Sequence, residues 1–571
     1  MAQPPGQRTQ WLDRLNDFSG GLSTSRNALL FDTKQSPRCL NVISRAKTRY
    51  LTRRPGQTVL PVLHTTDGSY VVTTETGRCN AMGDFTPVKQ APMIVAKWAG
   101  KIRFMRETDG LWRTLETGLV DEFGTVKSYT VASGTTSMTN YAIILSDATE
   151  KARRWNGTDA ATRLFGSSTT SGAANTDTVT PIAHDGESWR NRFFFFDIDG
   201  FPTRIQWTNA NSFTVASTNY QDVDIPGVKR IYTGKVLRNQ LYLFTRDSIH
   251  KVTYLGSDPL LQIGPALASV GVRSKRTIHL VIYKGEEHLI FLGTDNRVYL
   301  FNGFSAMAIS SQVDEPNDLS PYYMKRINGG AYNDAWAVAD DREQLYHLCV
   351  PYGTEGATNV RFVADYSGTE EEQGGAISWW PWDNQPFRAG CMASDITGRK
   401  RLVIGTTTGG TFFANKGNTD DATTADKAIQ TEWYTHKLSS QVTDLTVGTG
   451  VDFVMKRLGK VNSKVSYRID FDNAFTTEED MPNYSPSDTF LGGSGSEAFI
   501  LGSDTQVPST TQGTLGGPSY VKSTMSILSS FNFVEIRHRD SNTLDAWAMM
   551  QIVPRGFVVS AGYGVENRVA V

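Results

Sequence analysis

The side chains that most often bind metals or act as nucleophiles are few and widely spaced in this sequence. It contains eight histidines and four cysteines in 571 residues. The cysteines form no C-x-x-C pair, and no H-E-x-x-H segment, G-x-S-x-G elbow, P-loop or dinucleotide fingerprint occurs. We therefore expect buried, reduced thiols, no cofactor, no metal site and no enzymatic activity. The cysteines are Cys39, Cys79, Cys349 and Cys391.

One short segment, "DIDG" at residues 197–200, resembles the start of a calcium-binding loop. An EF-hand loop needs an oxygen ligand at its fifth position and a bidentate Glu at its twelfth. These two positions hold Phe201 and Thr208. The segment therefore indicates a tight turn between two strands rather than an ion site.

Two other clusters carry side chains that suit a binding partner. If exposed, Trp379, Trp380 and Trp382 would form a surface for stacking sugar rings or for a protein interface; if buried, they would pack sheets together. The sequence leaves both interpretations open. A basic run would face an acidic partner or a phosphate backbone, or would simply be a solvated strand face, which is the commoner case. Its cations are Arg45, Lys47, Arg49, Arg53 and Arg54.

The composition indicates that these clusters lie on a framework of short strands. The chain has 51 glycines and is rich in aromatics, with 28 Phe, 21 Tyr and 12 Trp, which suits many turns and pleated, half-buried surfaces. With 57 basic and 58 acidic residues, it lacks the basic excess of proteins that hold nucleic acid tightly. No apolar segment is long enough to span a membrane, and no secretion signal is recognisable. We expect synthesis in the cytoplasm.

A hairpin motif recurs along the chain. "NQLYLFTRDSIHKVTYLG" (239–256) and "EEHLIFLGTDNRVYLFNG" (286–303) share one layout of strand, polar turn, strand and closing Gly, and related segments occur at 141–157, 191–209 and 401–417. Such β units about 40 to 50 residues apart are typical of a β-propeller. Stacked β-sandwiches remain an alternative, because short strands with turn signals fit both folds.

These patterns predict an all-β protein: a β-propeller of six or seven blades with an extended N-terminal arm and a C-terminal β-sandwich. The predicted boundaries are 1–57 for the arm, which a neighbouring subunit would order, 58–418 for the propeller, 419–430 for a polar linker and 431–571 for the sandwich. The segment "RRPGQTVLPVLHTT" (53–66) is expected to lend a strand to the last blade and close the ring.

Three short segments near the N-terminus carry a resemblance to a known family. They are "DFSGGL" (17–22), "SPRCLNV" (36–42) and "RRPGQ" (53–57). Together with the stretch 239–313, they resemble bacteriophage virion proteins in which such a leader precedes a propeller body.

The resemblance implies a structural tail component of the virion, a nozzle or hub of a short-tailed phage. It further implies a homohexamer below the portal and adaptor ring, contacts with tail fibre or spike proteins, and double-stranded DNA passing through without specific binding. The alternative is a carbohydrate-binding or glycan-cleaving virion propeller that uses the three tryptophans. A cellular WD-like adaptor is less favoured, because the WD dipeptide does not recur.

Overall fold

The computed structural model describes most of the chain between residues 15 and 559. Residues 1–14, at the start of the predicted arm, and 560–571 lie outside the described part. So do 25–33, 60–62, 65–70, 73–76, 107–110, 134–136, 167–179, 257–258, 318, 369–376, 386, 395–397, 408–409, 417, 422–425, 439–444, 457–460, 471, 473, 483–519, 528–529, 532 and 541–546.

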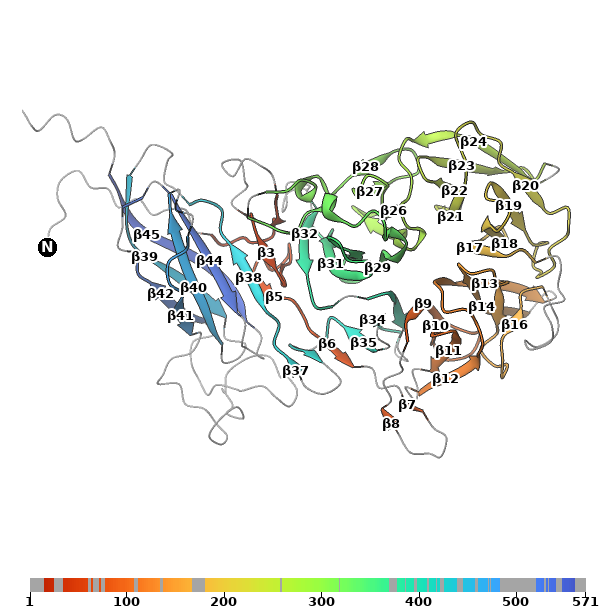
Figure 1. The fold of residues 1–571 in the computed structure, drawn as a ribbon, viewed down its shortest axis with the longest axis horizontal. Helices are drawn as coiled ribbons and strands as arrows, with labels where there is room; N and C mark the ends of the chain where they lie inside the picture. The colour runs from red at the N-terminus through yellow and green to blue at the C-terminus, as the bar shows by residue number, and fades with distance from the viewer. Residues whose placement is uncertain are drawn as a thin grey trace, which may run out of the picture.

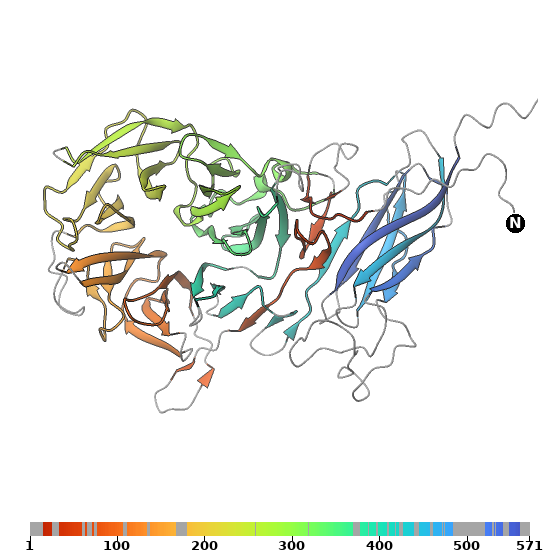
Figure 2. The same ribbon diagram turned by 180° about the vertical axis from the view of Figure 1, so that it is seen from behind.

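The larger body is a β-propeller (Figures 1 and 2). Within the described residues it has seven mainly antiparallel blades, each beginning with its innermost strand. Blade one contains β9 (Cys79–Phe85), β10 (Met93–Trp98), β11 (Lys101–Arg106) and β12 (Leu111–Glu116), extended by β7 (Leu63–His64) and β8 (Val71–Val72). Blade two contains β13 (Gly124–Ser133), β14 (Ser137–Ser146), β15 (Arg153–Trp155) and β16 (Arg163–Leu164). Blade three contains β17 (Ala183–Trp189), β18 (Arg192–Ile198), β19 (Arg204–Trp207) and β20 (Tyr220–Asp222).

The other four blades continue the ring. Blade four contains β21 (Ile231–Leu237), β22 (Gln240–Thr245), β23 (Ile249–Tyr254) and β24 (Leu261–Ala268). Blade five contains β25 (His279–Tyr283), β26 (Glu286–Leu292), β27 (Val298–Phe301) and β28 (Ala306–Ala308). Blade six contains β29 (Trp336–Asp340), β30 (Leu345–Pro351), β31 (Thr358–Asp365) and β32 (Ser378–Trp382). Blade seven contains β33 (Ala389–Ser394), β34 (Lys400–Gly405), β35 (Thr411–Ala414) and β6 (Gln57–Val59), followed by β36 (Asp420–Asp421) and β37 (Asp426–Lys427).

Packing between neighbouring blades forms most of the propeller core, as the run "FFFF" in β18 illustrates. Successive side chains of a strand point to opposite faces of its sheet. Phe193 and Phe195 accordingly pack toward blade two, whereas Phe194 and Phe196 pack toward blade four, and all four are fully buried. Because both faces of each blade are covered by neighbours, the strands read as continuous apolar runs rather than alternating ones.

The ring is closed by a strand from the N-terminal side. Strand β6 pairs antiparallel with β35, with Thr58 opposite Phe413, and becomes the fourth strand of blade seven. The predicted closure is therefore confirmed. The last blade is built from both sides of the propeller sequence, so the backbone hydrogen bonds of β6 hold the ring shut.

The smaller body is a β-sandwich of two mainly antiparallel sheets. One contains, in order, β3 (Cys39–Leu40), β38 (Thr431–Tyr434), β44 (Val534–Asp540), β40 (Asn462–Ile469) and β41 (Glu479–Pro482). The other contains β4 (Val42–Ser44), β5 (Leu51–Arg53), β45 (Ala548–Val559), β39 (Leu445–Lys456) and β42 (Tyr520–Met525), and β43 (Ser530–Phe531) also pairs with β39. Short 3₁₀ turns cover residues Lys275–Thr277, Ser311–Val313, Met324–Arg326 and Tyr332–Asp334.

The structure corrects two predicted segment boundaries. The described part of the predicted arm is not an extended tail: it supplies strands to both sandwich sheets (β3 to one; β4 and β5 to the other) and then β6 to blade seven. Strands β1 (Gly21–Leu22) and β2 (Gln35–Ser36) form a further small parallel sheet. Similarly, residues within the predicted linker 419–430 form β36 and β37 on blade seven. The chain itself supplies the hydrogen-bond partners that we assigned to a neighbour.

Candidate functional site

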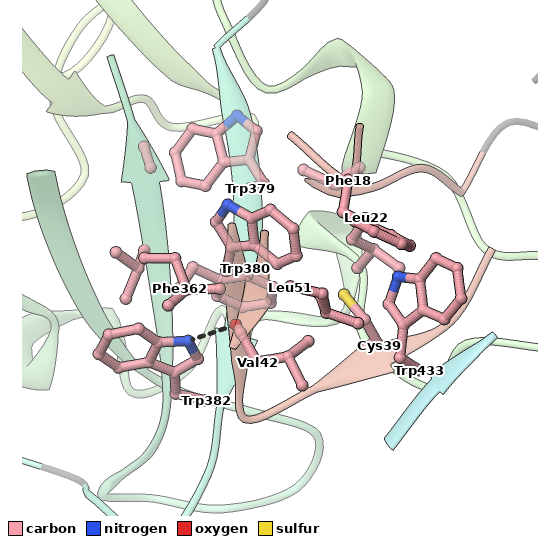
Figure 3. Close-up of a cluster of buried hydrophobic side chains, with 14 of the residues drawn as sticks. Phe18, Leu22, Cys39, Val42, Leu51, Phe362, Trp379, Trp380, Trp382 and Trp433 are labelled. Carbon is pink, nitrogen blue, oxygen red and sulfur yellow. Dashed lines mark hydrogen bonds between the residues drawn. The ribbon is translucent and has the colours of Figure 1, made fainter. Parts of the chain in front are cut away.

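The predicted aromatic cluster lies at the junction between the propeller and the sandwich (Figure 3). Trp379, Trp380 and Trp382 are on β32, the outermost strand of blade six, and each is 0% exposed. The indole N–H of Trp382 donates to the carbonyl oxygen of Val42 (3.1 Å), and that of Trp379 donates to the carbonyl oxygen of Ile309 (2.9 Å). The buried interpretation is the correct one, and the side chains do not form a sugar-stacking surface.

The N-terminal segment covers this strand closely enough to require a glycine. Gly21 has φ of +70°, a conformation that L side chains rarely adopt. A Cβ atom there would also lie 2.8 Å from the backbone nitrogen of Trp379. Beside it, Phe18 packs edge-on against Trp433 of the sandwich, with ring centroids 5.2 Å apart. The "DFSGGL" segment is thus shaped to lie between the two bodies.

Two of the predicted basic residues are buried in ion pairs rather than presented to a partner. Arg54 is 1% exposed, and its guanidinium donates to both carboxylate oxygens of Asp420 on blade seven (2.8 Å from Nη1 to Oδ1). Arg53 lies 3.8 Å from the Asp540 carboxylate of the sandwich. Burying an arginine costs less free energy when an opposite charge compensates it, which explains both pairings.

Asn41 links Arg54 to the propeller. Its φ of 54° lies in the left-handed region, which Asn tolerates better than most residues. The Asn41 side-chain oxygen accepts from Arg54 Nε and from the backbone N–H of Asp383, both at 2.9 Å. Its amide nitrogen donates to the carbonyl oxygen of Gln430 (2.8 Å). The "SPRCLNV" and "RRPGQ" segments therefore meet in one buried polar network.

The other three cations of the run lie nearer the surface. Arg45 lies 3.4 Å from Asp365 of blade six, and Arg49 lies 3.7 Å from Asp17 within the N-terminal segment. Lys47 is exposed. The run is therefore divided among several separate environments and does not form a single basic strand face.

The propeller axis carries a second polar cluster that the sequence analysis did not identify. Lys127 of β13 lies 3.6 Å from Asp185 and 3.3 Å from Glu187, both on β17. Lys235 of β21 lies 3.6 Å from the same Glu187. These side chains lie on or around an axial cavity of about 260 Å³. The innermost strands thus tie neighbouring blades together by ion pairs.

At one end of the axis the ion pairs continue around a smaller cavity of about 190 Å³. Lys275 lies 2.8 Å from Asp147 and 3.4 Å from Asp197. Burial alone would raise the pKa of Asp197, but hydrogen bonds from His184 and Arg230 and the charge of Lys275 outweigh it and hold that pKa well below its usual range. The carboxylate is therefore held as a charged partner.

Burial and the charge of Lys127 lower the pKa of Lys235, which lines the axial cavity. Burial, with the charge of Lys235, lowers the pKa of His279 to about 3, so this imidazole stays neutral at ordinary pH. Burial raises the pKa of Cys349 to about 11, which keeps its sulfur as the poorly nucleophilic thiol. Among the described residues, no group of three or more His, Cys, Asp or Glu side chains is placed to hold a metal. In the same residues, no helix is long and apolar enough to cross a membrane.

A signal for the axial cluster was present in the sequence. Three inner strands, "GTVKSYTVAS", "AHDGESW" and "IYTGKVL", each directly precede a repeated hairpin and carry charged side chains among apolar neighbours. Aligning the repeats on these preceding strands would have placed Lys127, Glu187 and Lys235 around one axis.

Comparisons with known proteins add little to this geometry. No family model matches the chain, and no curated protein matches it. Among solved structures, a chain of the "Crystal Structure of Mitotic Checkpoint Complex" is 9% identical with a TM-score of 0.35, covering 62% of this chain and 99% of that one. BamB from Moraxella catarrhalis is 11% identical (TM-score 0.30; 63% and 96% covered), and U3-55K is 8% identical (TM-score 0.33; 60% and 97% covered). Values this low say nothing about function, and the propeller assignment follows from the blade order and ring closure of this chain.

Proposed function

We propose that this protein is a structural component of a bacteriophage tail, a nozzle or hub whose copies form a homohexameric ring below the portal and adaptor. One observation carries the proposal. The segments that resemble the leader of phage propeller proteins, 17–22, 36–42 and 53–57, are the ones that join the propeller to the sandwich. The resemblance thus concerns residues with a defined architectural role.

The junction between the propeller and the sandwich suits a tail component that must transmit force without the two bodies moving relative to each other. Within a short stretch of chain, β3 pairs with one sandwich sheet, β5 with the other and β6 with blade seven. Rotation of the propeller against the sandwich would have to break backbone ladders and the buried Arg54–Asp420 pair together. A hinge would instead need a segment with few such contacts.

In this proposal the DNA passes along the axis of the ring of copies and not along the axis of one propeller. The propeller axis is crossed by the Lys127 and Lys235 ion pairs, which lie on or around the cavity of about 260 Å³. The formal net charge of −1 suits a wall that does not hold the phosphate backbone. Tail fibre or spike proteins would bind the outside of the ring.

The structure does not support the sugar-stacking surface on which the glycan-binding alternative was based. That surface required Trp379, Trp380 and Trp382 to be exposed, and all three are buried under the N-terminal segment. We therefore retain the tail component as the proposed function and use glycan binding as a comparison in the test.

The test is electron microscopy of the purified protein, alone and mixed with the adaptor of the same phage, together with mass spectrometry of purified virions. We expect the protein in virions and sixfold rings around an open axis in the mixture. Absence from virions would refute the tail assignment. Presence in virions with monomers in both samples would refute the ring, and a positive glycan array would then favour the alternative.

A further inference from the structure

A further cavity lies away from the propeller axis. This basic recess, of about 570 Å³, lies between blades six and seven beside β4. Its walls come from the turn between β29 and β30, the start of β34 and the end of β35, and its floor includes Trp382 and Asn415. Its volume is within the range of about 300–1,000 Å³ that is common for small-molecule sites.

The recess concentrates positive charge in a chain whose net charge is close to zero. Six cationic side chains line it against two carboxylates, and because Arg45 is also paired with the buried Asp365, the formal excess is three positive charges, whereas the whole chain carries −1. A concave surface of one charge sign raises the local concentration of ligands of opposite sign. The cations are Arg45, Arg342, Arg399, Lys400, Arg401 and Lys416, and the carboxylates are Asp340 and Glu343.

Both carboxylates are engaged at one end of the recess. Asp340 accepts from the backbone N–H groups of Arg342 and Glu343, each at 3.1 Å, inside the β29–β30 turn. The Glu343 carboxylate lies 4.0 Å from Arg45 Nη2, and Arg45 also donates to the Glu343 carbonyl oxygen. The positive excess is therefore displaced toward β34 and β35.

The cations on this side are partly held in place. Arg401 and Lys416 both lie over the ring of Phe413, with 5.8 and 5.5 Å from the Arg Cζ and the Lys Nζ to the ring centroid. Cation–π contacts of this kind reduce the freedom of long side chains before a ligand arrives. Less ordering is then needed on binding, which favours affinity.

A buried charge lies behind the floor. Arg361 is fully buried, and its guanidinium lies 4.7 Å from the Trp382 ring centroid. It donates to Gln385 and, at 3.5 Å, to Asn415, whereas its Nε and Nη1 have no hydrogen-bond partner among the described residues. Burial, together with the charge of Arg54, lowers the pKa of Arg361 to about 9, so it remains charged at neutral pH. An anion in the recess would compensate this charge through the low-dielectric wall.

We propose that the basic recess binds a small ligand that carries two or more phosphate groups. Each terminal phosphate group brings about −1.5 to −2 charges and three acceptor oxygens, so two such groups match the positive excess within this volume. Guanidinium groups, which supply four of the six cations, bind phosphate oxygens in bidentate pairs. The site does not depend on whether the protein forms a ring.

The test is isothermal titration calorimetry of the full chain with inorganic tripolyphosphate. Orthophosphate, hexaglutamate and a short single-stranded oligonucleotide serve as comparison ligands. The test variants are R342A and the double variant K400A/K416A. The matched control is K229A/K251A, which removes two lysines outside the recess. All five substituted residues are exposed, so each variant should fold, as thermal unfolding will verify.

We expect saturable tripolyphosphate binding that weakens roughly tenfold or more in K400A/K416A, weakens in R342A and is unchanged in K229A/K251A. Weaker binding of orthophosphate would support the requirement for several phosphates. No saturation at about 1 mM, or an equal loss in the control, would overturn the site. Tighter binding of hexaglutamate or of the oligonucleotide would overturn the phosphorylated ligand in favour of an acidic peptide or nucleic acid.

Discussion

Replacing Arg54 by alanine would test whether the N-terminal segment locks the two bodies together. The guanidinium donates to Asp420 (2.8 Å), to Asn41 (2.9 Å) and to the carbonyl oxygen of Asp383 (3.0 Å), and it is almost fully buried. In R54A the Asp420 carboxylate, which is 5% exposed, would lose its guanidinium partner. Breaking a buried ion pair from one side typically costs about 3–5 kcal/mol, and we expect a loss of that size.

The loss of stability in R54A should appear first in β6 and its partner β35 and only then in the whole protein, because Arg54 lies next to β6. Hydrogen–deuterium exchange would follow the amides of β6 and β35, where Thr58 pairs with Phe413. Urea unfolding would report the overall loss. The control is K47A, in the same basic run but exposed, for which the change should be within about 0.5 kcal/mol.

A double variant separates the charge effect from lost packing. In R54A/D420N the uncompensated carboxylate is gone, so part of the loss should be recovered relative to R54A. If R54A unfolds like K47A and β6 exchanges at the wild-type rate, the junction does not hold the ring closed and the reasoning is refuted.

Three further predictions follow from burial. The variant W382A should lower the free energy of unfolding by about 3–5 kcal/mol, because Trp382 is fully buried. The control F304A, at a side chain that is 74% exposed, should change it by less than about 0.5 kcal/mol. Equal urea midpoints for the two variants would contradict the buried junction. Burial lowers the pKa of His538 to about 3, below its unfolded value of about 6.5. The unfolded chain therefore binds a proton first, and stability is lost as pH falls from 6.5 toward 3, by about 1.4 kcal/mol per pH unit. The variant H538F should remove this part of the dependence of stability on pH, and an unchanged dependence would refute the assignment. The four buried thiols, Cys349 among them, should react with a thiol reagent only after denaturation, and rapid reaction of the native protein would show that they are accessible.

Much of the fold was predictable because its signals are local. Hairpins such as 239–256 and 286–303 show their strands and turns in adjacent residues, and their recurrence identifies blades. The closing strand β6 was predictable for a related reason: a ring of repeats with one strand missing at its end needs a strand from elsewhere. The sequence did not decide between six and seven blades, because some units are irregular, such as blade one, which is extended by extra strands.

The candidate sites were not predictable in the same way. The tryptophans of β32 are buried because β1, β3 and β4 cover that strand, and these come from more than 300 positions earlier in the chain. The basic recess likewise joins Arg45 to residues of β34 and β35. No spacing within one segment shows that such residues meet.

The sequence by itself therefore determined the strands, the turns and the repeated blade, because period-2 patterning and turn chemistry act between neighbouring residues. Only the tertiary structure decided which side chains are exposed and which charges meet. Arg54 and Asp420 are 366 residues apart, and their pairing depends on ring closure and on the path of the N-terminal segment between the two bodies. Burial is set by what covers a strand, and that covering is a long-range property of the fold.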